Sequence, residues 1–443
     1  MGTISEQAAI LRRRWETDPR WAEIERTYSA EAVLRLRGSV VEEHTLARLG
    51  ATRLWDLLHS QDAIRVPGAI SGSQAVQMAE AGLQAIYLSG SQVAADGNPA
   101  AHACPDQSRY PANPAPAMVR RINKALLDAD RMAWSGQGGE VPAQKWLAPV
   151  AANAEAGSGG VRNAFELMTA MIEAGAAGVC LEDRLSSEEK GGHLSGKVLI
   201  PTGQHITTLN AARLAADVLG VPALVIARTA ATDATLLTSD VDERDHEFLT
   251  GERTAEGFYR VRPGLYACVT RGLAFAPYAD LLWMETSTPD LAEARAFAQI
   301  IHSQYPDKML AYSCSPSCSW RAHLDDADIA KFQKELAAMG YRFQLTTPAG
   351  FRTLNPPVSG PAHGDARQDV PAYVPRQDAE FAGEPLGYSA ARHQREAGTT
   401  YFDLVTQALA PEAETTALAA SPEPVHFVGH DQVDHHGRLV PAD

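Results

Sequence analysis

Residues 210–229 read NAARLAADVLGVPALVIART, and they join a helical stretch directly to a short apolar run, the arrangement that decides the fold. The run at 223–229 is typical of a strand buried in a parallel sheet. Further runs of this kind lie at 68–71, 85–90, 146–153, 178–183, 281–286, 309–315 and 343–347. Together they predict an α/β protein built as a (β/α)8 TIM-type barrel, because open doubly wound sheets usually need only about five or six strands.

The chain on either side of the predicted barrel differs in character. Residues 1–60 carry polar and amphipathic helical patterns without a strand. The stretch 355–375 is rich in Pro and Gly and cannot hold a long helix, whereas a helical pattern returns at 388–408. We therefore predict an N-terminal helical region at 1–60, a catalytic barrel at 61–353 and a C-terminal helical and oligomerisation region with a loosely ordered tail at 354–443.

Composition limits the classes of partner. The chain has 443 residues, with 39 Lys and Arg against 54 Asp and Glu, which gives a net charge of −15. Such an acidic protein repels phosphate backbones and anionic lipids, so we expect no nucleic acid and no membrane partner. No apolar run approaches the roughly 20 residues that span a bilayer, and no signal-peptide core is visible, which predicts a cytoplasmic protein. The five cysteines are expected to be free thiols.

The predicted strands end on polar residues, and in such barrels the active site lies at the carboxyl ends of the strands. These residues are Ser89, Gly90, Asn153, Glu155, Glu182, Asp183, Arg228, Glu285, Ser313, Cys314, Ser315, Ser317, Thr346 and Thr347. The acidic groups, with Asp106 from a nearby loop, could bind Mg2+, and Arg228 with the hydroxyls could bind carboxylates. The pattern favours a metal-assisted enzyme acting on a small polycarboxylate; alternatively, these side chains only satisfy loop backbone groups.

One loop, 186–197 (SSEEKGGHLSGK), has the glycine-rich and charged composition of a mobile lid. Lys190 and His193 in this loop could donate hydrogen bonds to an oxyanion or a carboxylate. The alternative is an ordinary solvated surface loop.

Several longer stretches resemble one family. They are EDRLSSEEKGGHLSGKVLIPTGQHI at 182–206, YPANPAPAMVRRIN at 110–123, TSDVDERD at 238–245, WMETSTPDL at 283–291, AYSCSPS at 311–317 and AKFQKELAAMGYRFQ at 330–344. They are similar to isocitrate lyase of the isocitrate lyase/phosphoenolpyruvate mutase superfamily. The resemblance implies a barrel, a homotetramer with exchanged C-terminal helices, Mg2+ dependence, and cleavage of isocitrate to glyoxylate and succinate.

The resemblance also implies roles for individual residues. The succinate half of the site would comprise Gly192, His193, Arg228, Ser313, Ser315, Ser317 and Thr347, with Ser313 where the family has Asn. The glyoxylate and metal half would comprise Tyr87, Ser89, Gly90, Ser91, Asp106, Asn153, Glu155 and Glu182. In this half Ser91 stands where the family has Trp, and Asn153 where it has a metal-ligating Asp, so Mg2+ affinity should fall. Ala230 and Thr232 also replace acids.

The lid departs furthest from the family. The family signature Lys-Lys-Cys-Gly-His becomes Glu189-Lys190-Gly191-Gly192-His193 here, and Gly191 has no side chain that could give a proton. Proton transfer would then fall to Lys190, His193, Tyr87 or water, with Arg228 also in the catalytic set. Cys180 or Cys318 could substitute, but a buried or incidental thiol is the simpler interpretation.

Three functions follow from this pattern. The changes favour a repurposed carbon–carbon lyase, or a related enzyme, on a different di- or tricarboxylate. The first alternative is a non-catalytic paralogue that binds a dicarboxylate, and the second is ordinary isocitrate cleavage.

Overall fold

The computed structural model describes residues 3–94, 114–136, 145–155, 157–188, 196–315, 320–347 and 399–411, with single positions between 379 and 388. The chain divides into two compact units. The first comprises Met1–Gly72, Leu83–Asn123 and Ala148–Phe351 and contains every strand found among the described residues. The second comprises Ser73–Gly82, Lys124–Leu147 and Arg352–Asp443. The predicted boundaries at residues 60 and 353 stay predictions.

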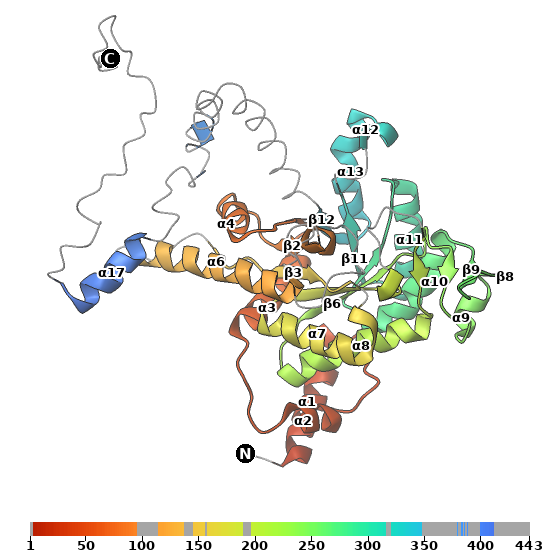
Figure 1. Ribbon diagram of the computed structural model, residues 1–443, viewed down its shortest axis with the longest axis horizontal. Coiled ribbons are helices and arrows are strands. Elements are labelled where there is room, and N and C mark those ends of the chain that lie inside the picture. Colours follow the sequence, from red (N-terminus) through yellow and green to blue (C-terminus); the bar gives the residue numbers. More distant parts are fainter. Residues whose placement is uncertain are drawn as a thin grey trace, which may run out of the picture. The chain divides into compact units, whose positions relative to one another are not determined.

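Eight parallel strands form a nearly closed barrel in the first unit (Figure 1). Their order is β1-β12-β11-β10-β6-β4-β3-β2, and a parallel bridge between Gly68 and Tyr87 links the two outermost strands. The strands are β1 (Ile64–Pro67), β2 (Ile86–Leu88), β3 (Val150–Asn153), β4 (Gly178–Glu182), β6 (Leu224–Thr229), β10 (Leu281–Met284), β11 (Met309–Ser313) and β12 (Tyr341–Thr346). The predicted barrel fold is therefore confirmed.

The first strand lies earlier than the sequence predicts. It spans Ile64–Pro67 and pairs with Phe343–Thr346 of β12, whereas the predicted run 68–71 leads into helix α4 (Gly72–Glu80). The short segment Ile64–Pro67 alternates buried and more exposed residues, a pattern that a search for continuous apolar runs does not detect. The prediction of a strand at 68–71 was wrong.

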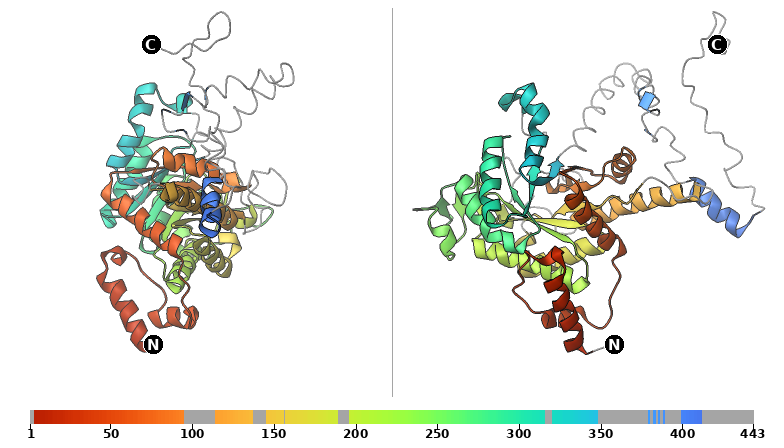
Figure 2. Two further views of the ribbon diagram at one scale, coloured as in Figure 1. Left: turned by 90° about the vertical axis from the view of Figure 1, so that its left-hand side faces the viewer. Right: turned by 180° about the vertical axis from the view of Figure 1, so that it is seen from behind.

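Helices lie on the outside of the strands, as the views in Figures 1 and 2 show. They include α7 (Val161–Glu173), α8 (Thr202–Leu219), α10 (Leu265–Phe275), α11 (Leu291–Gln304) and α13 (Asp326–Ala338). Local chemistry sets their ends. The side chains of Asp290 and Asp325 accept hydrogen bonds from the first turns of α11 and α13, and α8 ends at Gly220 in the left-handed conformation.

The N-terminal residues form helices α1 (Ile4–Thr17), η1 (Pro19–Trp21), α2 (Ala30–Arg37) and α3 (Thr45–Ser60). Helix α3 places Ala51, Leu54 and Leu58 in the same buried cluster as barrel residues such as Ile226 and Trp283. Helix α3 is therefore part of the barrel's core, and burial of each of these two leucines contributes about 1.5–3 kcal/mol to the free energy of folding.

A second, four-stranded sheet has the order β5-β7-β9-β8 and has no counterpart in the sequence predictions. It consists of β5 (Val198–Leu199), β7 (Leu236–Leu237), β9 (Tyr259–Val261) and β8 (Leu249–Arg253). The short helices nearby and elsewhere are α5 (Gly90–Gln92), η4 (Gly157–Gly159), η5 (Ser186–Glu188), α9 (Glu243–His246), η6 (Ala276–Tyr278) and α12 (Trp320–His323). Strands β5, β7 and β9 have only two or three residues, too few to show periodicity, and the five residues of β8 are mostly exposed and form no apolar run, which explains why all four were missed.

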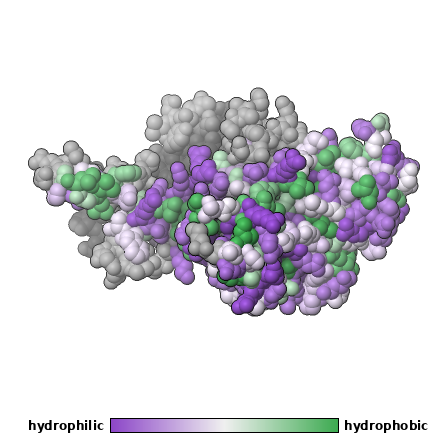
Figure 3. Space-filling view, turned by 90° about the horizontal axis from the view of Figure 1, so that it is seen from below, coloured by the Kyte–Doolittle hydropathy of each residue, from purple (hydrophilic) through white to green (hydrophobic). Residues whose placement is uncertain are grey.

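Two further helices are α6 (Pro114–Gly136) and α17 (Thr399–Leu409). Helix α17 exposes Phe402, Val405 and Leu409, and it forms the hydrophobic patch at the left of Figure 3. Searched over the described residues, the helices include none that is both long and apolar enough to cross a membrane. The Pro- and Gly-rich stretch 355–375 lies outside the described residues.

Candidate active site

Most of the predicted site residues that the structure describes gather at one end of the barrel. Tyr87 lies on β2 and is followed by Ser89 and Gly90, Asn153 ends β3, Glu182 ends β4 and Arg228 lies near the end of β6. Glu285 follows β10, Ser313 ends β11, and Ser315 and Thr347 follow β11 and β12. Because the strands are parallel, their carboxyl ends meet at one rim, as predicted for an active site.

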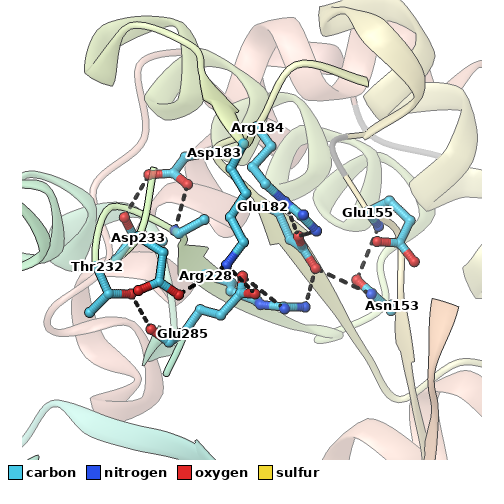
Figure 4. Close-up of polar contacts among 12 residues, drawn as sticks. Asn153, Glu155, Glu182, Asp183, Arg184, Arg228, Thr232, Asp233 and Glu285 are labelled. Carbon is cyan, nitrogen blue, oxygen red and sulfur yellow. Dashed lines mark hydrogen bonds and ion pairs between the residues drawn. The ribbon is translucent and has the colours of Figure 1, made fainter. Parts of the chain in front are cut away.

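A buried chain of charges crosses this rim (Figure 4). Arg228 Nη1 donates to Glu182 Oε1, and Arg228 Nη2 forms an ion pair with Glu285 Oε2 at 2.9 Å. The guanidinium also lies 4.2 Å from the centre of the Trp283 ring. Arg228 is therefore fixed between two carboxylates and an aromatic face, an arrangement that suits a planar guanidinium.

This pairing shifts the pKa values of Arg228 and Glu285. Burial alone would lower the pKa of Arg228, but Glu182 and Glu285 raise it well above its ordinary value. Burial alone would raise the pKa of Glu285, but Arg228, Arg184 and Lys197 lower it to about 2. Arg228 and Glu285 therefore both stay charged at neutral pH.

Three members of the network were missed from the sequence. Arg184 Nε donates to Glu182 Oε2 at 2.7 Å, and Lys197 Nζ donates to Glu285 at 3.1 Å and to Asp233 at 3.3 Å. Arg184 directly follows the predicted strand end and Lys197 closes the glycine-rich loop, so position alone could have suggested both. Asp233 has no comparable signal. Nearby, the Thr232 hydroxyl donates to the Glu285 carbonyl, and Ala230 N donates to Asp183.

Asn153, Glu155 and Gly90 form a second group beside the charges. Glu155 N donates to Asn153 Oδ1 at 3.0 Å, and Asn153 Nδ2 donates to Glu182 Oε1 at 3.3 Å. Glu155 has a φ of 51°, which non-glycine residues rarely adopt. A β-carbon on Gly90 would lie 1.2 Å from Glu155 Oε1, so only glycine leaves room for this carboxylate.

The described oxygen ligands predicted for Mg2+ are largely engaged with protein donors. Both Glu182 oxygens accept from arginines, and Asn153 Oδ1 accepts from a backbone amide. Among the described residues no group of three His, Cys, Asp or Glu side chains is arranged to hold a metal ion. Because Mg2+ requires oxygen ligands in near-octahedral geometry, these residues do not fit the ion in this arrangement.

Tyr87 and Gln92 place polar atoms inside the rim. Tyr87 is 1% exposed and Gln92 2% exposed, and their side-chain polar atoms have no hydrogen-bond partner among the described residues. Burial is the main reason that the pKa values of Tyr87 and of the neighbouring Cys180 thiol lie well above their ordinary values. Both groups therefore remain protonated at neutral pH, and buried polar atoms of this kind commonly face a ligand or water.

The predicted carboxylate-binding hydroxyls are brought together in part. The Ser315 hydroxyl donates to the carbonyl oxygen of Thr347, which joins the ends of β11 and β12. Ser313 is partly exposed at the end of β11. Asp106, Lys190, Gly191, Gly192, His193 and Ser317, with the side chain of Ser91, lie outside the described residues.

The comparisons with known proteins agree with this architecture. The isocitrate lyase family model matches residues 7–254 and 249–422. Isocitrate lyase 1 of Mycobacterium tuberculosis (strain Erdman) is 56% identical over 422 residues, covering 95% of this chain and 98% of that protein. Isocitrate lyase of Escherichia coli (strain K12) is 52% identical over 435 residues, covering 96% of this chain and all of that protein (100%).

Among solved structures, 2,3-dimethylmalate lyase, a PEP mutase/isocitrate lyase superfamily member, matches with a TM-score of 0.53 and 21% identity. The match covers 81% of this chain and 98% of that one, and at this identity it shows the fold alone. The family model and the two relatives go further, because each covers nearly the whole chain. The chain belongs to the isocitrate lyase family.

Proposed function

We propose that the protein is a carbon–carbon lyase that cleaves isocitrate into glyoxylate and succinate. The observation that carries this proposal is 56% identity over 95% of the chain to an isocitrate lyase. The sequence pattern by itself favours a repurposed lyase. The extent of the identity to curated isocitrate lyases favours the second alternative, ordinary isocitrate cleavage, instead.

The charge network supports binding of a polycarboxylate. Arg228 holds two carboxylates of the protein, and its Nε has no hydrogen-bond partner among the described residues. A substrate carboxylate could take the place of Glu285 beside this guanidinium at little electrostatic cost, because one anion replaces another. The hydroxyls of Ser313 and Ser315 lie at the end of β11, which pairs with the β10 strand that Glu285 follows, and they could bind a second carboxylate there.

The proposed reaction breaks one carbon–carbon bond. A base removes the proton from the substrate hydroxyl, and the oxygen's electron pair forms the carbonyl of glyoxylate. The electron pair of the broken bond moves to the succinate carbon, which must then receive a proton. No oxidant or reductant is required, so the enzyme has to hold the carboxylates, take one proton and return one.

The source of the returned proton is the open step. Gly191 has no side chain, so the cysteine that the resemblance places in the lid cannot act here. Of the other candidates, Tyr87 and the thiol of Cys180 lie within the described residues, and burial raises the pKa of both, so both are protonated at neutral pH. We propose Tyr87 as the proton donor when the lid offers none.

The test is release of glyoxylate and succinate in equal amounts from threo-isocitrate by the purified full-length protein. A Gly191→Cys variant should raise kcat if the lid lacks its acid. Ser195→Cys is the matched control, because it adds a thiol elsewhere in the same loop and should leave kcat unchanged. Absence of any product from isocitrate would overturn the proposal.

A different 2-hydroxy acid is the second candidate substrate. It is favoured by Ser91, which is smaller than the Trp that the resemblance implies and would leave room for a bulkier group. Cleavage of an alkyl-substituted malate, with none of isocitrate, would identify a repurposed lyase. Tight binding of succinate without turnover of either compound would indicate the non-catalytic alternative.

We also propose the homotetramer that the resemblance implies. Helix α17 supports this assembly, because the side chains of Phe402 and Leu409 are 65% and 82% exposed. Exposed apolar side chains grouped on one helix commonly mark a contact with another protein chain. Light scattering coupled to size-exclusion chromatography should give four times the chain mass of 47.5 kDa. A monomeric mass would contradict this assembly.

A further inference from the structure

We infer that the side-chain amide of Asn153 holds the carboxylate of Glu182 in place by a hydrogen bond, so that no divalent cation is needed between residues 153 and 182. The inference concerns how the rim assembles, and it does not depend on which substrate the enzyme cleaves. It rests on the hydrogen bonds of Asn153, on the partners of Glu182 and on the balance of charge around them.

The orientation of the Asn153 amide is fixed by its neighbour. The backbone N–H of Glu155 points at Asn153 Oδ1 at 3.0 Å, and an N–H donor requires an oxygen acceptor. The amide nitrogen must therefore face the other way, toward Glu182 Oε1 at 3.3 Å. Asn153 is 4% exposed, so water competes little for either contact.

Glu182 has no free position for a metal ion in this arrangement. One oxygen accepts from Arg228 and Asn153, and the other accepts from Nε and Nη2 of Arg184. The Glu182 side chain is 0% exposed and those of Arg184 and Arg228 are 2% and 10% exposed. A Mg2+ ion bound to Glu182 at about 2.1 Å would have to displace one of these donors from the carboxylate and so remove an ion pair from a buried cation.

The charge balance leads to the same conclusion. Three carboxylates, Glu182, Asp233 and Glu285, are paired with three cations, Arg184, Lys197 and Arg228. An aspartate at 153 would add another carboxylate and place a charged oxygen about 3.3 Å from Glu182, a repulsion that a cation would have to relieve. The neutral amide turns this repulsion into a hydrogen bond.

The experiment uses Mn2+ as the probe on the full-length protein without substrate. Electron paramagnetic resonance should show no saturable binding of Mn2+ to the wild type at micromolar to low millimolar concentrations. Asn153→Asp should bind Mn2+ at least tenfold more tightly than the wild type. The melting temperature of the wild type should be the same in EDTA and in Mg2+, whereas that of Asn153→Asp should be lower in EDTA and recover when Mg2+ is added.

Asn123→Asp is the matched control. Asn123 is also buried, and its amide donates to the main-chain carbonyls of Ala174 and Gly175 at 3.0 and 3.1 Å rather than to a carboxylate. Its aspartate variant should lose stability equally in EDTA and in Mg2+. Micromolar Mn2+ binding by the wild type, or a wild-type melting temperature that rises with Mg2+, would overturn the inference even if Asn153→Asp does not fold.

Discussion

The barrel holds a buried ion network at each end of its strands, and the two networks use different partners. At the carboxyl ends, Arg228 and Lys197 donate only to side-chain carboxylates among the described residues. At the amino ends, Arg213 donates to the Ala223 carbonyl as well as to Asp280, and Lys308 donates to the Ala279 carbonyl as well as to Glu23. The cations at the amino ends are thus attached to the main chain.

The difference separates a structural network from one suited to ligands. A main-chain carbonyl cannot leave without unfolding its segment, so the network at the amino ends fixes the chain. Arg37 illustrates this, because it joins helix α2 to the carbonyls of Asp217 and Val218 at the end of α8. A side-chain carboxylate can rotate away and be replaced by that of a substrate. Changes at the amino ends should therefore affect stability, and changes at the carboxyl ends activity.

The largest expected effect is on stability. Asp280→Asn leaves the buried Arg213 without its carboxylate and should lower the free energy of unfolding by about 3–5 kcal/mol. Urea unfolding followed by circular dichroism measures this loss. At temperatures where the variant is folded, kcat/KM for isocitrate should equal that of the wild type, and a large fall in kcat/KM would break the distinction between the two ends.

At the carboxyl ends, Arg228→Lys should reduce kcat/KM for isocitrate roughly a hundredfold. Lysine keeps the charge but loses the planar fork that holds Glu182 and Glu285 together, which corresponds to about 2.7 kcal/mol at the active site. Steady-state glyoxylate release gives the value. Arg213→Lys is the matched control at the other end of the strands, and it should leave kcat/KM unchanged.

A third test measures how the stability of the protein depends on acidic pH. The pKa of Glu285 is lowered from 4.5 to about 2, so its pairing contributes stability that is present above pH 4.5 and is lost as the pH falls through 2. The melting temperature of the wild type should fall over this range, and Glu285→Gln should fall less steeply. Equal slopes for the two proteins would show that Glu285 is not a source of the acid sensitivity.

The smallest effect on stability is expected at an exposed ion pair, which serves as a reference for the buried pairs. Arg295 and Glu335 form a surface pair at 3.4 Å with side chains 51% and 42% exposed. Glu335→Gln should change the free energy of unfolding by less than about 0.5 kcal/mol, because solvent screens exposed pairs. The same urea experiment measures it, and a loss comparable with that of Asp280→Asn would mean that burial does not distinguish these pairs.

Much of the rim can be predicted from the sequence, because a polar residue marks the end of each buried apolar run. Glu182 and Arg228 each close a run of buried residues, and the parallel order then brings them to one edge. The partners are harder to predict. Lys197 pairs with Glu285 across 88 residues, and only the closed barrel brings them together. No local periodicity carries that information.

The same limit applies to Asn153 and to the first strand. The sequence shows that Asn153 replaces an acid of the family and so lacks a negative charge. It does not show that the Asn153 amide donates a hydrogen bond to Glu182, because the orientation of that amide depends on the backbone N–H of Glu155. The strand at Ile64–Pro67 was missed because four residues with alternating burial are too few for a pattern to stand out.

The three described cysteines have a consequence for kinetics. Cys180 lies in β4, Cys268 in α10 and Cys314 just after β11; all three are buried, and none of them forms a disulfide. Thiol reagents attack the thiolate, and burial raises the pKa values of Cys180 and Cys268. The rate of thiol labelling at each position should therefore be limited by local opening of the chain. Mass spectrometry of the labelled sites over time would then rank the opening rates of the strand, the helix and the rim.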